Sequence, residues 1–447
     1  MTAPFEDDQN APAPFGGSVV QAAQVSGNRP DRVAWFRTLG LGLFIHWSVD
    51  SQLGMVISHS LVGASADYVR RYFDELPGTF CPERFAPDEW ARLAKVCGFR
   101  YVVFTTKHHN GFCMFATSTT DYDVMHTPYG RDITQQVVAA FRKQGLAIGF
   151  YFSPDDFSVL HRQGIEIARG RQEVDPLHNP DLMALNRAQL RELLTHYGPV
   201  DLLFFDGQAE GLKQLAWELQ PDVVVTRGDM ATPEQRLPDR ALPGPWESCI
   251  TMGTAWQYQP TNETYKSGRD LILLLAEARA KGGNLLLNVG PKPDGALPEE
   301  QIGRLMELGL WNFINAEAVF GVEPCALVRE PGAWYTRSGD TVYAILTDID
   351  WAQAEDTTGH SFAAGPRTYG KRAAVTLRHV RIGPDTVVSV LGQSGRHLEY
   401  NDAADPAPRW RQDEAGLHVS LMSSQRIYDA WGWDNPVVLK ITRASVQ

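Results

Sequence analysis

The amino-acid sequence predicts an α/β protein made of a (β/α)8-like barrel, regular or irregular, followed by a C-terminal antiparallel β-sandwich. Apolar runs of strand length alternate with helical patterns through most of the chain, which favours a parallel sheet wrapped by helices. No glycine-rich phosphate loop follows the first run, which weakens the dinucleotide-binding alternative. Past about Val322 the pattern changes to short β-rich runs separated by turn residues, as in a small sandwich.

The length of 447 residues allows a barrel of roughly 250–320 residues and a smaller partner domain. We expect a disordered N-terminal arm over 1–30, a catalytic barrel over 31–322 and a sandwich domain over 323–447. The arm lacks the charged and then apolar order of a secretory signal. The chain as written therefore predicts a cytoplasmic protein, or a periplasmic or secreted one if a signal has been removed.

Six near-continuous apolar runs are expected to form the barrel strands, because strands covered on both faces carry few polar residues. They span 41–47, 101–107, 147–153, 200–206, 223–227 and 284–289. Helices are expected between them, from Pro87 to Gly98, from an Asn179 cap to Gly198, and from Gly268 to Lys281. In the C-terminal region the β-rich runs cover 341–346, 374–377, 386–391 and 437–442.

The composition excludes several classes of partner. The net charge is −12 and no run of Lys or Arg forms a basic patch, so we expect no nucleic-acid partner and no anionic membrane partner. No segment offers the ~18 uninterrupted apolar residues of a membrane helix. The five cysteines show no metal-binding spacing and predict free thiols. The oligomeric state is left open.

Polar side chains follow nearly every apolar run, at the point where each predicted strand ends. Because the carboxyl ends of barrel strands meet on one face, these side chains are expected to share a site. A single acid after a strand is usually a helix cap, but seven such endings predict a functional rim. They are His46, His108 with His109, Tyr151, Asp206, Arg227, Glu247 (closing a short segment after a Pro-rich stretch) and Asn288.

Two carboxyl groups on this rim predict cleavage of glycosidic bonds, which needs one ionised and one protonated carboxyl. Asp206 follows a wholly apolar strand end, and Glu247 lies about one βαβ unit later. Two alternatives remain at this point. The paired histidines, with His46 and Asp206, would also suit a metal-dependent barrel hydrolase. An inactive sugar-binding protein is the other alternative. Neutral imidazoles and Arg227 suit an uncharged substrate better, so we expect no metal and no cofactor.

The same residues carry a family resemblance. The segments FIHW (44–47), TKHHNGFCMF (106–115), FFDG (204–207), WESC (246–249) and KGGNLLLNVGPKPDGALPEEQ (281–301) resemble the α-L-fucosidases of glycoside hydrolase family 29. The resemblance covers roughly 35–321, and the C-terminal pattern is similar to that family's sandwich.

The resemblance implies a retaining, exo-acting α-L-fucosidase that acts on fucosylated glycans by double displacement. Asp206 matches the family's nucleophile and Glu247 its acid/base. The residues His46, His108, His109, Tyr151 and Arg227 fall where the family holds fucose hydroxyls, with Tyr68 and Trp256 as walls. Asn110, Ser48 and Gln257 depart from the family pattern, which leaves a related sugar such as L-galactose open.

Overall fold

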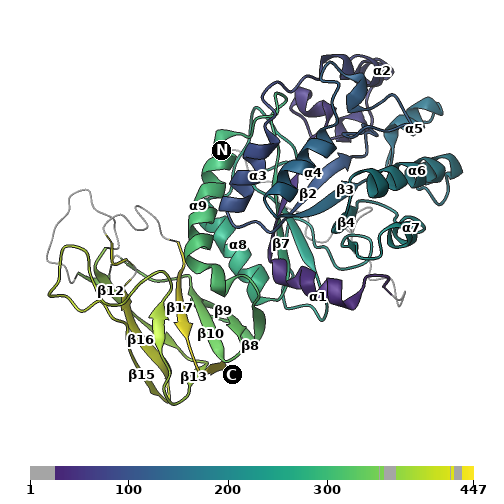
Figure 1. The fold of residues 1–447 in the computed structure, drawn as a ribbon. Coiled ribbons are helices and arrows are strands. Elements are labelled where there is room, and N and C mark those ends of the chain that lie inside the picture. Colours follow the sequence, from purple (N-terminus) through teal and green to yellow (C-terminus); the bar gives the residue numbers. More distant parts are fainter. Residues whose placement is uncertain (1–25, 352, 357–368, 423, 427–434) are drawn as a thin grey trace.

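The computed structural model describes residues 26–351, 353–356, 369–422, 424–426 and 435–447 (Figure 1). Most of the predicted arm, residues 1–25, therefore lies outside the described residues. The rest forms a barrel of parallel strands and helices next to a smaller body of antiparallel strands, which confirms the predicted fold class.

The barrel contains a curled sheet of seven parallel strands in the order β5-β4-β3-β2-β1-β7-β6. All six predicted runs are present in it. Two isolated bridges, Ala231 with Trp246 and Glu234 with Cys249, join the segment after β5 to β6. The strands are β1 Leu41–Ile45, β2 Tyr101–Lys107, β3 Ala147–Phe152, β4 Leu202–Phe205, β5 Val224–Val225, β6 Glu247–Thr251 and β7 Asn284–Val289.

Helices surround this sheet, and the three predicted ones are among them as α3, α6 and α8. They are α1 Pro30–Leu39, α2 Ala66–Asp74, α3 Pro87–Val96, α4 Ile133–Lys143, α5 Phe157–Arg162, α6 Pro180–His196, α7 Leu212–Leu219, α8 Gly268–Ala280 and α9 Glu299–Asn315. Six short 3₁₀ helices add to them: η1 Val49–Leu53, η2 His59–Leu61, η3 Pro77–Thr79, η4 Val124–His126, η5 Gln172–Val174 and η6 Ala316–Ala318. Among the described helices, none is both long enough and apolar enough to cross a membrane.

Helix α1 closes the amino-terminal end of the barrel. Its Phe36 is fully buried and packs edge-on against Tyr101, the first residue of β2. The Phe36 carbonyl accepts a hydrogen bond from Asn284, the first residue of β7, and Arg279 donates to the Arg37 carbonyl. Among the described residues, α1 therefore seals this end of the barrel, and a site is expected at the carboxyl end.

Strand β6 corrects the expected placement of Glu247. The sequence suggested a short segment closing at this residue, but Glu247 is the first residue of the strand, level with Asn284 of β7. The strand was missed because its sequence, ESCIT, begins with two polar residues and has only five residues in all.

The C-terminal body is a sandwich of two main antiparallel sheets. One has the order β14-β17-β10-β9-β8 and the other β11-β12-β16-β15, with β13 and β18 as a separate pair. The strands are β8 Glu323–Glu330, β9 Ala333–Ser338, β10 Thr341–Leu346, β11 Glu355–Asp356, β12 Lys371–Leu377, β13 Val380–Ile382, β14 Val388–Val390, β15 Arg409–Asp413, β16 Gly416–Met422, β17 Val437–Ile441 and β18 Ala444–Val446.

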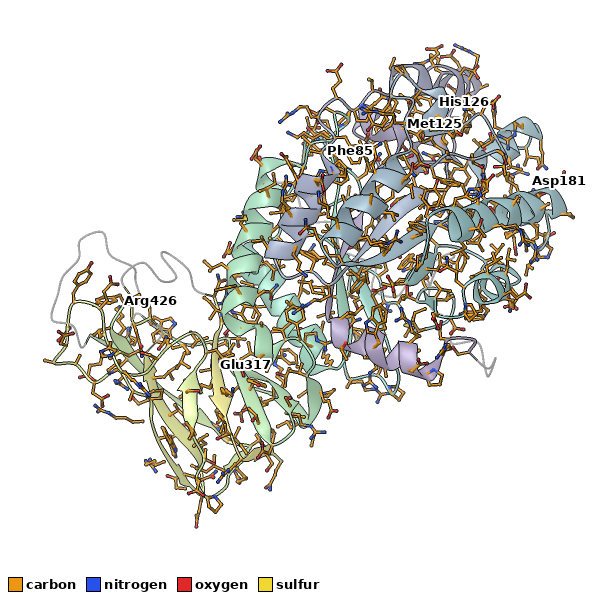
Figure 2. All side chains as sticks on the ribbon, in the orientation of Figure 1. Phe85, Met125, His126, Asp181, Glu317 and Arg426 are labelled. Atoms are coloured by element: carbon orange, nitrogen blue, oxygen red, sulfur yellow. The ribbon has the colours of Figure 1, made fainter. Side chains whose placement is uncertain are left out.

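The sandwich has its own apolar core, in which Tyr335, Val342, Leu417 and Val419 meet. It joins the barrel at the end of α9, where Figure 2 places Glu317 at the junction. The Glu317 carboxylate accepts from Lys440 Nζ at 2.6 Å and from the Tyr343 hydroxyl at 3.0 Å, so residues of η6, β10 and β17 hold the two bodies together.

Candidate active site

Five of the predicted residues form a cluster at the carboxyl ends of neighbouring strands. They are His46, His108, His109, Tyr151 and Asp206. The His108 ring stacks on the Tyr151 ring at 5.3 Å and 3°, and the His46 ring meets it edge-on at 5.3 Å. The His109 ring lies 4.3 Å from that of His108. The structure therefore brings together residues that follow or end β1, β2 and β3, as the parallel sheet predicts.

Asp206 lies at the centre of this cluster with both carboxylate oxygens in use. Oδ2 accepts from the Tyr151 hydroxyl at 2.7 Å, and Oδ1 accepts from Arg227 Nη1 at 3.0 Å. Burial alone would raise the pKa of Asp206, but the Arg227 charge and the Tyr151 hydrogen bond hold that pKa well below its usual range. Its side chain is 21% exposed, so an ionised carboxylate is accessible to solvent.

Arg227 also holds a second carboxylate, which sequence reasoning missed. Its Nη2 donates to Glu234 Oε2 at 2.9 Å, and the Glu234 side chain is 41% exposed. The two guanidinium nitrogens are roughly 2.3 Å apart, so the bonded oxygens of Asp206 and Glu234 lie within about 8.2 Å of each other. This upper bound leaves room for the roughly 5–5.5 Å separation of the two carboxyl groups in retaining glycosidases.

The structure does not bring Glu247 to this rim. Its Oε2 accepts a hydrogen bond from Tyr101 at the amino-terminal end of β2, and the residue is fully buried. Cys249, two residues later on the same face of β6, contacts Arg227 Nη2 at 3.6 Å. Glu247 therefore lies about 6.6 Å further along the strand toward the sealed end. Its predicted acid/base role stays a prediction, which this placement does not favour.

The Glu247 carboxyl has a raised pKa because it is buried. Burial raises its pKa to about 7, while the hydrogen bond from Tyr101 lowers it only in part. A contact with the Thr226 side chain and the charge of Arg227 also lower this pKa without offsetting the burial. A raised pKa would suit a general acid, but a general acid must also reach the oxygen that it protonates.

The three histidines of the cluster are buried and neutral near pH 7. Burial lowers the pKa of His46 to about 4 and that of His109 to about 3, and the pKa of His108 also falls well below its usual value. Each ring uses Nδ1 within the protein: His46 on Asn288, His108 on Ser58 and His109 on Ser153, at 2.6, 2.7 and 2.6 Å.

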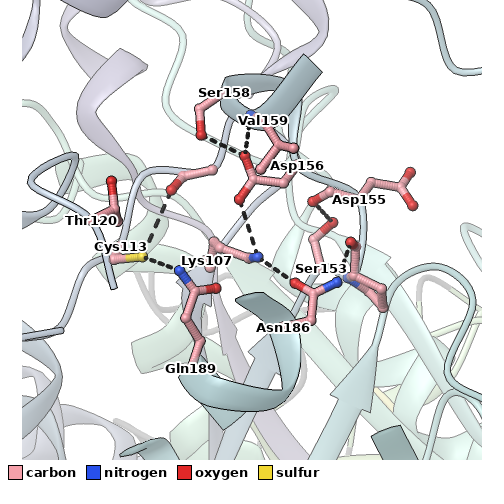
Figure 3. A network of polar contacts seen from close by, with 12 residues as sticks. Lys107, Cys113, Thr120, Ser153, Asp155, Asp156, Ser158, Val159, Asn186 and Gln189 are labelled. Atoms are coloured by element: carbon pink, nitrogen blue, oxygen red, sulfur yellow. Dashed lines mark hydrogen bonds and ion pairs between the residues drawn. The ribbon is translucent and has the colours of Figure 1, made fainter. Parts of the chain in front are cut away.

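A buried network supports the loop that carries Ser153 (Figure 3). Lys107 Nζ pairs with Asp156 at 3.3 Å and donates to Asn186 Oδ1 at 2.8 Å. Asn186 in turn donates to the Pro154 carbonyl at 2.7 Å. The opposite charges of Lys107 and Asp156 are paired and almost fully buried. This network therefore fixes the 153–156 turn beside His109.

The predicted wall residues differ in their placement. The Trp256 ring lies 4.8 Å from the His46 ring, so it borders the cluster. Tyr68, on α2, instead contacts Met55 Sδ at 3.7 Å and the Tyr72 ring, and its wall role stays a prediction. His59 was missed: its ring lies 5.7 Å from His109. No strand pattern surrounds His59, and only the fold brings it to the rim.

His108, His109 and Asp206 could also hold a metal ion, because one possible ligand atom from each lies within 4.8 Å of the others. The Asp206 carboxylate, however, is already compensated by the Arg227 guanidinium. A further cation there would be repelled by that guanidinium, which disfavours a metal site.

Comparison with known proteins gives a consistent family. The model of the family "Alpha-L-fucosidase" matches residues 18–317. An α-L-fucosidase of Branchiostoma floridae is 27% identical, over 90% of this chain and 91% of its own length. The tissue α-L-fucosidase of Mus musculus is 28% identical, over 72% of this chain and 78% of its own length.

Solved structures agree. α-L-Fucosidase isoenzyme 1 from Paenibacillus thiaminolyticus has a TM-score of 0.71 and 27% identity, covering 92% of this chain and 98% of that one. A family 29 α-L-fucosidase from Bacteroides thetaiotaomicron, trapped as a covalent intermediate with 2-fluoro-fucosyl fluoride, has a TM-score of 0.70 and 23% identity, covering 95% and 98%.

Proposed function

The chain belongs to the α-L-fucosidase family, glycoside hydrolase family 29, and we propose that it releases terminal L-fucose with Asp206 as nucleophile and Glu234 as acid/base. The activity is that of a retaining glycoside hydrolase, as the predicted enzyme class stated. The observation that carries the proposal is the Arg227 guanidinium, which binds one carboxylate on each terminal nitrogen at the open rim.

The reaction takes two displacements. In the first, Asp206 attacks the anomeric carbon, the glycosidic bond breaks, and the departing oxygen takes a proton from Glu234. In the second, Glu234 removes a proton from water, the water oxygen bonds to the anomeric carbon, and the Asp206 carboxylate leaves. Two inversions give net retention. Tyr151 and Arg227 donate to Asp206 and keep it ionised and oriented for attack.

Glu234 is preferred to Glu247 because a proton donor must contact an oxygen that lies outside the protein. Glu234 is exposed and shares Arg227 with the nucleophile, whereas Glu247 is buried against Tyr101. The fucose ring would lie over the imidazoles of His46, His108 and His109, whose neutral nitrogens suit an uncharged sugar. The aglycone would leave on the Glu234 side.

The test is hydrolysis of an aryl α-L-fucoside, with the first-formed anomer read by NMR, beside the L-galactoside and a panel of fucosylated oligosaccharides. Retained configuration on the fucoside supports the proposal, and the panel defines the linkage. Inverted product would contradict it. Fucose binding without hydrolysis would favour an inactive sugar-binding protein, and loss of activity with a chelator would favour a metallohydrolase.

A further inference from the structure

Each of the three buried histidines of the rim makes a hydrogen bond through Nδ1 to a side chain of the protein, and within the described residues none makes one through Nε2. In a neutral imidazole one nitrogen carries the proton and the other accepts, and the partner on Nδ1 decides which is which. The partners of His46, His108 and His109 differ in whether they can accept that proton, so the proton on each ring can be assigned.

On His109 the proton lies on Nδ1. Ser153 Oγ has one proton, which it donates to the Asp155 carbonyl at 2.9 Å (Figure 3), so it can only accept from His109. Nε2 then carries a lone pair and lies 3.5 Å from Asp206 Oδ2, longer than the 2.7–2.9 Å of a charge-assisted hydrogen bond. Two acceptors face each other there, and a hydroxyl donor between them would relieve the repulsion.

On His46 the proton also lies on Nδ1. Asn288 Nδ2 donates to the Trp256 carbonyl at 2.6 Å, which fixes the amide so that Oδ1 faces the imidazole. The opposite amide orientation would place two acceptors against each other at 2.6 Å. Because an amide oxygen only accepts, His46 must donate from Nδ1, and its Nε2 carries a lone pair.

On His108 the proton lies on Nε2. Ser58 Oγ accepts from the Asn110 backbone N–H at 2.9 Å. Within the described part of the chain, His108 Nδ1 at 2.7 Å is the acceptor that remains for the Ser58 proton. Ser58 therefore donates to Nδ1, and the Nε2–H of His108 is left as a donor.

We propose that Ser58, Ser153 and Asn288 are positioning residues that fix a pattern of two acceptors and one donor, so that the sugar must present two hydroxyl donors and one hydroxyl acceptor. His46 and His109 accept, and His108 donates. This inference rests on the proposed function, because it takes an α-L-fucoside ring as the ligand. The choice of sugar then depends on where the histidine protons lie as well as on the shape of the site.

The first test uses inhibition constants of L-fucose and its monodeoxy and monofluoro analogues at C2, C3 and C4, measured against an aryl fucoside. Fluorine accepts weakly and cannot donate. At two ring positions the deoxy and fluoro analogues should bind about 10–100-fold more weakly, to the same extent. At the position facing His108, fluorine should recover part of that loss.

The proton assignment is wrong if L-fucose inhibits but fluorine recovers binding at all three positions, or at none of them. If the aryl fucoside is not cleaved and L-fucose does not inhibit, the proposed function fails instead, so the two failures are distinguishable.

The second test reads the protons directly in the native protein. Nitrogen NMR after ¹⁵N-histidine labelling separates protonated from unprotonated ring nitrogens. We expect His46 and His109 to be protonated on Nδ1 and His108 on Nε2, and a proton on His109 Nε2 would overturn the assignment.

A matched pair of variants tests whether Ser153 sets the position of the His109 proton. Ser153→Ala should move the His109 proton to Nε2 and let fluorine recover binding at one more position. Ser153→Thr keeps the hydroxyl and should keep the native pattern. An unchanged fluorine pattern in a folded Ser153→Ala protein would contradict the positioning role.

Discussion

The two ends of the barrel interior hold similar residues with opposite roles. The amino-terminal end carries Glu247, Arg279 and Asn284, and the carboxyl-terminal rim carries Asp206, Glu234 and Arg227. At the sealed end, Arg279 Nε and Nη2 donate to the Val319 and Arg37 carbonyls. At the rim, Arg227 holds two carboxylates that stay partly exposed. An acid and an arginine in a barrel are thus structural or catalytic according to which end they occupy.

The largest expected effect lies at the rim. Asp206→Ala should lower kcat/KM by about 10⁴-fold or more, because the covalent pathway is lost while the fold is kept. Azide should restore part of the activity by replacing the missing nucleophile. Steady-state kinetics and circular dichroism measure both effects. A folded variant with near-native turnover would remove Asp206 from the mechanism.

The next effect separates the two glutamates. Glu234→Gln should lower kcat/KM by about 10²–10⁴-fold on fucosides with poor leaving groups, and much less on activated aryl fucosides, because only the poor leaving groups need the proton. Glu247→Gln is the matched control and should keep this leaving-group dependence native. The reverse result, with Glu247→Gln showing the selective loss, would restore the sequence-based assignment.

At the sealed end we expect a loss of stability and little loss of activity. Arg279→Met leaves the acceptors of Val319, Gly283 and Arg37 without their donor, which should cost about 3 kcal/mol of unfolding free energy. Denaturant unfolding measures this cost. The folded fraction should keep kcat/KM within roughly two-fold, and a selective kcat defect at full stability would contradict the comparison.

A second effect at the sealed end is a pH dependence of the unfolding free energy. Burial raises the pKa of Glu247 to about 7 from an ordinary 4.5, so between these values the folded state binds more protons than the unfolded chain. Its contribution therefore makes the unfolding free energy fall as pH rises from about 5 to 7. Thermal unfolding of Glu247→Gln should show a flatter profile than the native protein across this window. Parallel profiles would show that Glu247 does not titrate there.

Much of the fold could be predicted from the sequence. Strands β1 to β4 and β7 are buried on both faces, so their sequences are almost continuously apolar. The rim residues His46, His108, His109, Asp206 and Arg227 followed from those strand ends. β6 could not be predicted in this way, since ESCIT begins with polar residues.

Glu234 could not be found either, because its relation to Asp206 exists only through Arg227. The partners of the histidines are equally remote, since Ser58 lies 50 residues from His108 along the chain. Such pairings depend on which strands become neighbours, and local periodicity carries no record of that.

The shared guanidinium of Arg227 has a consequence for the precision of the site. Because one rigid, planar group binds both Asp206 and Glu234, a single side chain sets the spacing of the two carboxylates. Lysine would keep the positive charge at this position but not the fork, so both carboxylates would lose their common reference point at once.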